Sequence, residues 1–224
     1  NEAALLDERD RLLDQLSSQA GVSATFDTNG AVTVRATGSG DVLVGGGVVT
    51  PIAMSTAADG RLSFTVGGSP FGNATGSLAG LAEAANHVAD QRAALDTVAT
   101  QFAGQLNTAH QAGVDANGNG GQPLFTGTTA ATLTAAPLTA AQVAAATPTS
   151  SNGNMLALGA MRGATDPEAT WSGHMATQAQ ATASARAQNA AAATRADGAA
   201  TARDTVSQVD LDKEAAELLR FQQA

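Results

Sequence analysis

The sequence predicts an α+β fold: a bundle of long helices built from discontinuous segments, with a small antiparallel β subdomain inserted after the first helix. Apolar residues recur at helical spacing in residues 1–20, 77–112 and 168–224. Between the first two segments the apolar period changes to two, which is typical of strands. Each helix carries an apolar stripe that it cannot bury alone, so we expect the helices to pack side by side.

These segments divide the chain into three expected parts. The first is a helical bundle domain made of residues 1–20, 77–112 and 150–224. The second is an inserted β subdomain of residues 21–76, and the third is a glycine-rich loop with a low-complexity connection over residues 113–149.

Composition excludes several classes of protein. The hydrophobic fraction of 43% is enough for a core, but it is mostly alanine, with six Phe, one Trp and no Tyr. A net charge of −9 with one lysine argues against nucleic-acid partners and anionic membranes, because both need clustered cations. The absence of cysteine excludes disulfides and thiolate chemistry, and no apolar run reaches the roughly 18 residues of a transmembrane helix.

The first segment is an amphipathic helix. Its leucines recur at heptad-compatible spacing, charged residues fill the other face, and Gly21 is expected to end it. The chain begins without Met or signal-peptide features, as if cut from inside a longer protein. The leucines are Leu5, Leu6, Leu12, Leu13 and Leu16.

The β subdomain begins with a hairpin. Residues 22–26 and 31–35 alternate in polarity around Asn29-Gly30, a dipeptide that favours hairpin turns. Three more strands are expected, the last of them after the Asp59-Gly60 turn, and residues 67–76 are expected to be a linker. These three strands cover residues 41–44, 48–54 and 61–66.

Residues 77–112 give the clearest helical pattern. Its seam positions alternate spacings of four and three from Leu81 to Ala109, and only Arg92 interrupts the apolar series. A helix of this kind runs on the order of 45 Å, which favours a rod-like bundle. A charged residue in a seam more often extends its charge to water, or marks a bundle end or a partner contact, than forms a buried ion pair. We therefore expect Arg92 at an interface, and Gly113 to end the helix.

The remaining chain is alanine-rich. Residues 126–149 allow no prediction, residues 154–162 predict a short helix, and Asp166-Pro167 can begin a long helix in which Gly198 is a weak point. The C-terminal stretch places Leu and Ala side chains on one helical face, with Asp210 as N-cap. We expect this face to carry assembly contacts. Its residues are Leu211, Ala215, Leu218, Leu219 and Phe221.

The best candidate for an ion site is a glycine-rich loop. Asp115, Asn117 and Asn119 occupy the first, third and fifth positions of a calcium loop, but its twelfth position is Thr126 instead of Glu. A turn whose Asx side chains bond their own backbone is therefore the favoured interpretation. The histidines show no metal-ligand spacing and are expected at surfaces or interfaces. No catalytic motif or cofactor fingerprint is present, so neither an enzyme nor a cofactor is expected.

Three blocks carry more specific patterns. The first is Leu5-Leu6-Asp7-x-Arg9-Asp10-x-Leu12-Leu13-Asp14-x-Leu16. The second is Leu95-Asp-x-x-Ala-x-x-Phe102, followed by Leu106-Asn107, His110, Gly113, Asp115-x-Asn-Gly118, Gly121 and Leu124-Phe125. The third is Val209-Asp-Leu-Asp-x-Glu214 with Leu218-Leu-Arg-Phe-Gln-Gln223.

Together, and in this order, the blocks resemble the flagellar hook-associated protein 1 family. Hook and rod relatives share a looser form of the third block, so a related axial protein is an alternative. The residues that match the family motifs are Asp7, Arg9, Asp10, Asn107, Gly113, Asp115, Asn117, Gly118, Phe125, Asp210, Glu214, Arg220 and Gln222.

The resemblance implies a non-enzymatic structural subunit at the hook–filament junction, outside the cell. It implies type III export without a cleaved signal and an export chaperone that binds the C-terminal region. The implied partners are copies of the chain itself and neighbouring hook and filament-side junction subunits. The family's inner-tube segments are expected to be missing here, so the fragment is expected to be monomeric in isolation.

A secreted binding or adhesion module that uses the β subdomain is a second hypothesis. The expected strands contain Phe26 and Phe64 but no Trp or Tyr, which are too few aromatic side chains for a typical sugar platform.

Overall fold

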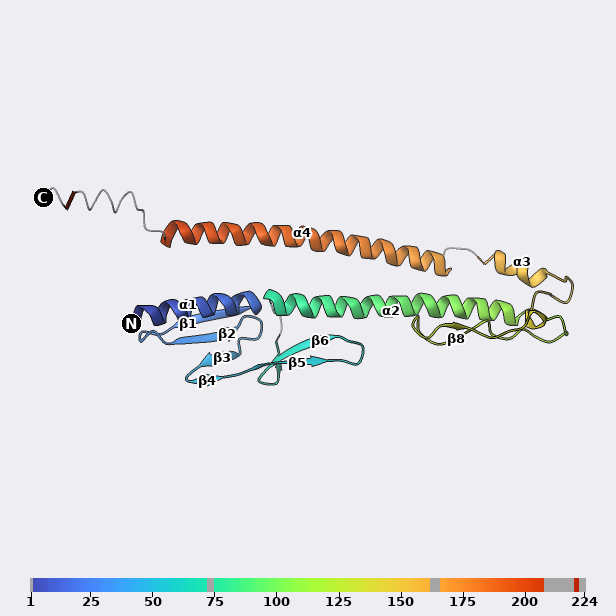
Figure 1. The fold of residues 1–224 in the computed structure, drawn as a ribbon, viewed down its shortest axis with the longest axis horizontal. Coiled ribbons are helices and arrows are strands. Elements are labelled where there is room, and N and C mark those ends of the chain that lie inside the picture. Colours follow the sequence, from blue (N-terminus) through green and yellow to red (C-terminus); the bar gives the residue numbers. More distant parts are fainter. Residues whose placement is uncertain (1, 72–74, 162–165, 208–219, 222–224) are drawn as a thin grey trace. The chain divides into compact units, whose positions relative to one another are not determined.

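A computed structural model describes residues 2–71, 75–161, 166–207 and 220–221 (Figure 1). It confirms the α+β class, with helices and small antiparallel sheets. The chain divides into two compact units, residues 1–159 and 160–224, and each is described separately below. The helices are α1 (Glu2–Gln19), α2 (Gly76–Gln111), α3 (Gly153–Gly159) and α4 (Pro167–Ser207).

In the first unit, α1 and α2 meet end to end, and the β subdomain is inserted in the sequence between them (Figure 1). Gly76 permits this joint, because a Cβ there would lie 2.7 Å from the carbonyl oxygen of Ser18 and its φ is +80°. The two helices were expected side by side. They lie in line instead, and both pack on the core of the β subdomain (Figure 1).

Gly21 does not act as the expected left-handed helix cap. The helix ends at Gln19, and no positive φ occurs at Gly21. A Cβ at Gly21 would lie 2.5 Å from Thr75 Oγ1 and 2.6 Å from Thr37 Oγ1. Glycine is therefore required at this position by close packing at the joint.

The β subdomain consists of two antiparallel sheets, with strand orders β1-β2-β3-β4 and β5-β6-β7. Two expectations are wrong here. Residues 48–54 form two strands in different sheets, separated at Pro51, which has no N–H for a ladder. The expected linker contains β7. The strands are β1 (Val22–Phe26), β2 (Val32–Ala36), β3 (Val42–Gly45), β4 (Val48–Val49), β5 (Ile52–Thr56), β6 (Leu62–Val66) and β7 (Ser69–Pro70).

The hairpins β1–β2 and β5–β6 are equivalent copies offset by 30 residues. Val22 pairs with Ala36 as Ile52 pairs with Val66, and the rest of the two registers matches in the same way. Both turns contain a glycine with positive φ, +79° at Gly30 and +91° at Gly60. The sequence identity between the copies is low, so the structure reveals a repeat that the residue pattern conceals.

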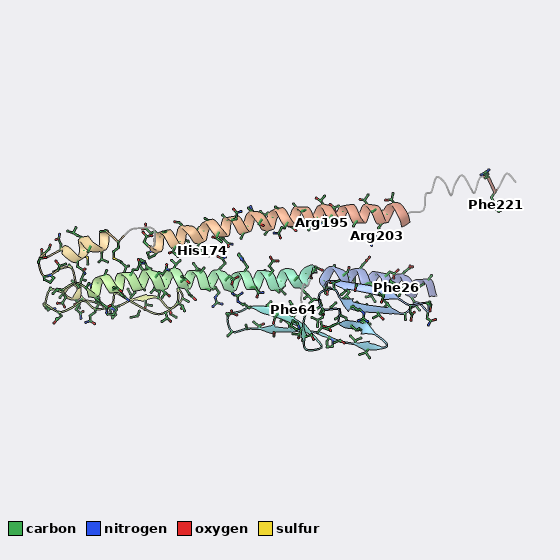
Figure 2. The ribbon with its side chains drawn as sticks, turned by 180° about the vertical axis from the view of Figure 1, so that it is seen from behind. Phe26, Phe64, His174, Arg195, Arg203 and Phe221 are labelled. Atoms are coloured by element: carbon green, nitrogen blue, oxygen red, sulfur yellow. The ribbon has the colours of Figure 1, made fainter. Side chains whose placement is uncertain are left out.

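Both hairpins face one hydrophobic core at the joint of α1 and α2. Val34 and Phe64 occupy the same position in the two copies and are both buried. Figure 2 labels Phe64 in the second hairpin. The helices cover this core with partly buried side chains, namely Leu13 and Leu16 from α1 and Leu78 and Ala82 from α2. The β subdomain is therefore fixed to both helices by apolar packing.

The chain after α2 folds back on the end of that helix. Short strands β8 (Phe125–Thr126) and β9 (Thr134–Ala135) pair antiparallel, and a 3₁₀ turn, η1 (Ala140–Gln142), follows them. A capping box between Thr139 and Gln142 closes this turn. The stretch for which the sequence allowed no prediction thus has defined backbone pairing.

The second unit is the long helix α4. Asp166 precedes it and accepts a 2.6 Å hydrogen bond from the Ala169 N–H, with Pro167 at the first helical position, which confirms the predicted start. The helix continues through Gly198. The described residues include Trp171 and Met175 as exposed large apolar side chains on α4. The packing of residues 150–224 into a bundle stays a prediction.

Candidate assembly surface

A line of large apolar side chains, here called the α2 stripe, is exposed along α2. Its members recur every seven residues and therefore share one helical face. They are Leu81, Val88, Leu95 and Phe102, with 51%, 58%, 38% and 38% of their surface exposed. Small side chains at Ala85 and Ala99 lie between them in the seam. Such a face allows a second helix to approach closely.

Helix α1 divides its leucines between two faces. Leu13 and Leu16 pack on the β core, whereas Leu5 and Leu12, seven residues apart, are 73% and 51% exposed. Leu5 and Leu12 are here called the α1 pair. Charged residues flank them, including the exposed Glu8–Arg11 ion pair, in which Arg11 lowers the pKa of Glu8. An apolar centre with a charged rim is the usual composition of a protein–protein contact.

Arg92 lies in the seam between Val88 and Leu95 and is exposed. It is therefore not part of a buried ion pair. Its role at a partner contact stays a prediction.

Among the motif residues of the first block, Arg9 connects α1 to the first hairpin. Its guanidinium lies 4.5 Å from the ring centroid of Phe26 and donates a 3.1 Å hydrogen bond to the Gly30 carbonyl. It also pairs with Asp10, while Asp7 is exposed. Arg9 thus holds the turn of the first hairpin on α1.

The second hairpin is held on α2 in an equivalent way. Asn86 Oδ1 accepts a 3.1 Å hydrogen bond from the Leu62 N–H, and Arg61 pairs with Asp90. Asn86 and Asp90 were not among the residues predicted to be functional. Their spacing of four places both on one helical face, and this was the available signal.

The second block closes the C-terminal end of α2. The Asn107 side chain forms the pair of hydrogen bonds that a neighbouring strand would form with Phe125. Its Nδ2 donates to the Phe125 carbonyl and its Oδ1 accepts from the Phe125 N–H, both at 2.8 Å. The ring of Phe125 lies 5.1 Å from that of Phe102. The side chain of Asn107 therefore fixes strand β8 beside the helix.

Asp115 forms a turn with its own loop. Its Oδ1 accepts hydrogen bonds of 2.8 Å from the N–H groups of Asn117 and Asn119, and Gly118 has a φ of +83°. The hydrogen bond from the backbone N–H of Asn119, more than any other interaction, holds the pKa of Asp115 below its ordinary value. No group of three His, Asp or Glu side chains gathers as a metal site in the described ranges.

The expectation of a surface or interface histidine is wrong for His110, which is completely buried. Its Nδ1 lies 2.6 Å from the Gln122 carbonyl oxygen, and its Nε2 accepts a 2.8 Å hydrogen bond from the Ala144 N–H. The Ala144 carbonyl in turn accepts from Asn154 Nδ2 at 2.7 Å. Seam spacing alone gave no sign of this burial, because the covering residues come from later in the chain.

The third block lies mostly outside the described residues. This holds for the expected interface residues Leu211, Ala215, Leu218 and Leu219 and for the motif residues Asp210, Glu214 and Gln222. Arg220 and Phe221 are described, and the Phe221 side chain is 91% exposed (Figure 2). Their assembly role stays a prediction.

No described helix combines the length and the apolar character needed to cross a lipid bilayer.

A family model that covers more than half of the chain identifies its family. The family model described as the flagellar hook-associated protein FlgK helical domain matches residues 1–125. Flagellar hook-associated protein 1 of Escherichia coli (strain K12) is 33% identical over 132 residues, covering 54% of this chain and 24% of that protein. The solved flagellar hook junction protein FlgK from Burkholderia pseudomallei is 29% identical with a TM-score of 0.42, covering 55% of this chain and 25% of its own. The chain thus spans about a quarter of the length of either relative.

Proposed function

Since the chain belongs to the family of the flagellar hook-associated protein FlgK, we propose that it is a structural subunit of the bacterial flagellum that joins hook to filament. In this proposal the subunit acts through contacts between helix faces and catalyses no reaction. The observation that carries it is the exposed α1 pair, which lies within the residues that match the family's helical domain.

The apolar side chains exposed on α1 and α2 support a role in helix association. Burying one large aliphatic side chain contributes about 1.5–3 kcal/mol, so each exposed Leu or Val on these helices can stabilise a contact when a partner covers it. The α2 stripe, with alanines between its large side chains, suits close contact with another alanine-rich helix. We assign this stripe to residues 150–224, which would complete a helical bundle domain with residues 1–20 and 77–112.

The α1 pair suits a neighbouring subunit. Leu5 and Leu12 are more exposed, on average, than the members of the α2 stripe, and charged residues surround them. Copies of the same chain and the adjacent hook and filament-side junction subunits are the proposed partners. An export chaperone that binds the C-terminal region and a location outside the cell, at the junction, belong to the same proposal and rest on family membership.

A filament assay tests the contact surface. The subunit carrying Leu5→Asp and Leu12→Asp is produced in a motile host whose own hook-associated protein 1 has been deleted. We expect loss of swimming in soft agar and hooks without filaments in electron micrographs, because two carboxylates would have to be buried at the contact.

The matched control is Ala3→Asp with Ser17→Asp, which adds the same two charges to other exposed positions of α1. Circular dichroism of both purified variants establishes that α1 and the β subdomain remain folded. Normal filaments with the Leu5/Leu12 variant would refute the role of the α1 pair.

A further inference from the structure

Strand β5 is an edge strand: among the described strands only β6 pairs with it. Its register shows which of its backbone groups face outward. The carbonyl of Phe64 on β6 accepts a hydrogen bond from the Phe71 N–H, so it points away from β5. Met54, directly opposite Phe64, therefore points its own N–H and C=O away from β6, and by alternation so do Ile52 and Thr56. These three residues present a row of backbone donors and acceptors.

Proteins usually block such an edge with a charge, a proline, a bulge or a covering element. The other outer strands of the β subdomain are blocked in these ways. Strand β7 contains Pro70, and β4 is two residues long and is followed by Pro51. Helix α1 contacts β1, and the Arg9 guanidinium lies over Phe26 at the end of that strand. By contrast, β5 contains no charge or proline, pairs with β6 without a register shift, and is exposed over residues 53–56.

The Met54 side chain extends the apolar surface of the β subdomain to this edge. Residues directly opposite each other in an antiparallel pair lie on the same face, so Met54 shares the face of Phe64. Phe64 is buried in the core, whereas Met54 is 60% exposed. A strand added beside β5 would bond the outward N–H and C=O groups and would also cover Met54. The edge therefore fits an extended, uncharged segment with an apolar residue at its centre.

We propose that β5 pairs with the β5 strand of a second copy of this chain, antiparallel and centred on Met54. Strand β5 is itself extended, uncharged and apolar at its centre, so it has the composition that its own edge fits. In this register Met54 lies opposite Met54 of the second copy, and Ile52 lies opposite Thr56. The outward backbone groups of these residues then bond one another. The contact is self-complementary, as two-fold pairing requires, and it brings no like charges together.

This contact goes beyond the proposed junction role and uses neither the α1 pair nor the α2 stripe, so either proposal can fail without the other. Two strands of five residues bury a small interface, and we expect a weak dimer with a dissociation constant of about 0.1–1 mM. The family resemblance predicts a monomer in isolation. The oligomeric state of the chain at high concentration therefore distinguishes the two expectations.

Dilution of the 224-residue chain from about 1 mM, followed by NMR, tests the pairing. The amide shifts of Ile52, Met54 and Thr56 are expected to change with concentration. The N–H groups of Ala53 and Ser55 face β6 and should change less. In a mixture of isotope-labelled and unlabelled chains, a nuclear Overhauser contact is expected between Met54 of one copy and Met54 of the other. Shifts that stay constant up to about 1 mM would overturn the proposal.

Variants at Met54 locate the contact. Met54→Pro removes an outward N–H and leaves the hydrogen bonds to β6, so dimerisation, followed by translational diffusion, should be lost. Met54→Lys keeps every N–H and places two like charges together, and it should weaken the dimer at least about tenfold at low salt. Ala24→Pro and Ala24→Lys, the matched controls, make the same changes at the equivalent position of β1 and should retain the dimer.

A further variant separates this contact from the helical surface. Leu5→Asp with Leu12→Asp removes the α1 pair and should leave the β5 dimer unchanged. Association that survives both Met54 substitutions, or that is lost with the Leu5/Leu12 variant, would place the contact elsewhere and overturn the proposal.

Discussion

Gly113 and Gly121 lie where the loop after α2 folds back on the helix end, and neither has room for a side chain. A Cβ at Gly113 would lie 2.2 Å from Asn154 Nδ2, and one at Gly121 would lie 2.1 Å from the His110 carbonyl oxygen. The sequence suggested a helix stop at Gly113 because glycine often adopts positive φ there. The structure gives a different reason, because close approach of two segments excludes the Cβ atom.

Gly121→Ala is expected to destabilise the chain by about 1–3 kcal/mol or more, because the added methyl group meets rigid backbone. The control is Gly120→Ala, whose Cβ would meet nothing within 4 Å and whose φ is not positive. It should change the free energy of unfolding little. Urea unfolding of both variants measures the difference, and equal stabilities would show that the loop can move away from His110.

At the scale of elements, polar contacts orient each hairpin, while apolar burial stabilises it. Arg61 and Asp90 are both well exposed, so solvent screening leaves their ion pair little contribution to stability. Burial of Phe64 and Val66 contributes about 1.5–3 kcal/mol each. The equivalent contacts of Arg9 and Asn86 therefore determine on which helix each hairpin turn lies, and the shared core determines that the hairpins fold.

The turn at residues 115–119 is expected to lose stability in acid. The Asn119 and Asn117 amides lower the pKa of Asp115 in the folded chain below its unfolded value of about 3.9. The turn therefore contributes stability above about pH 4 and loses it as pH falls through the folded pKa. Asp115→Asn should reduce the fall in unfolding free energy between pH 6 and pH 3.

Urea unfolding at the two pH values measures this effect, and Asp7→Asn on the exposed face of α1 is the control. An Asp115→Asn chain with the same pH dependence as the parent would contradict the role of the turn.

At the scale of the whole molecule, the α2 stripe is an exposed apolar face that another helix can cover. Each compact unit has its own organisation, and α4 is rich in alanine with few large side chains. Under our proposal, residues 150–224 cover the stripe. Its apolar side chains therefore stabilise the 224-residue chain more than a chain that ends at Gly159. This follows from the heptad pattern of α2 and from the exposure of the stripe in the first unit.

Val88→Ser with Leu95→Ser is expected to lower the unfolding free energy of the 224-residue chain by about 2 kcal/mol or more. In a chain ending at Gly159 the same change should cost much less, because the stripe is then in water in both states. Effects of helix propensity are equal in the two backgrounds and cancel. Equal costs in both chains would exclude residues 160–224 as the cover.

The sequence by itself determined the α+β class, the positions of the long helices, the first hairpin turn at Gly30 and the start of α4 at Asp166. These features depend on local periodicity, turn residues and caps, which a short window of sequence contains. Only the tertiary structure decided that α1 and α2 lie in line, that the two hairpins are equivalent, and that His110 is buried. Those features depend on contacts between residues far apart in the chain, such as His110 with Ala144, for which no local pattern exists.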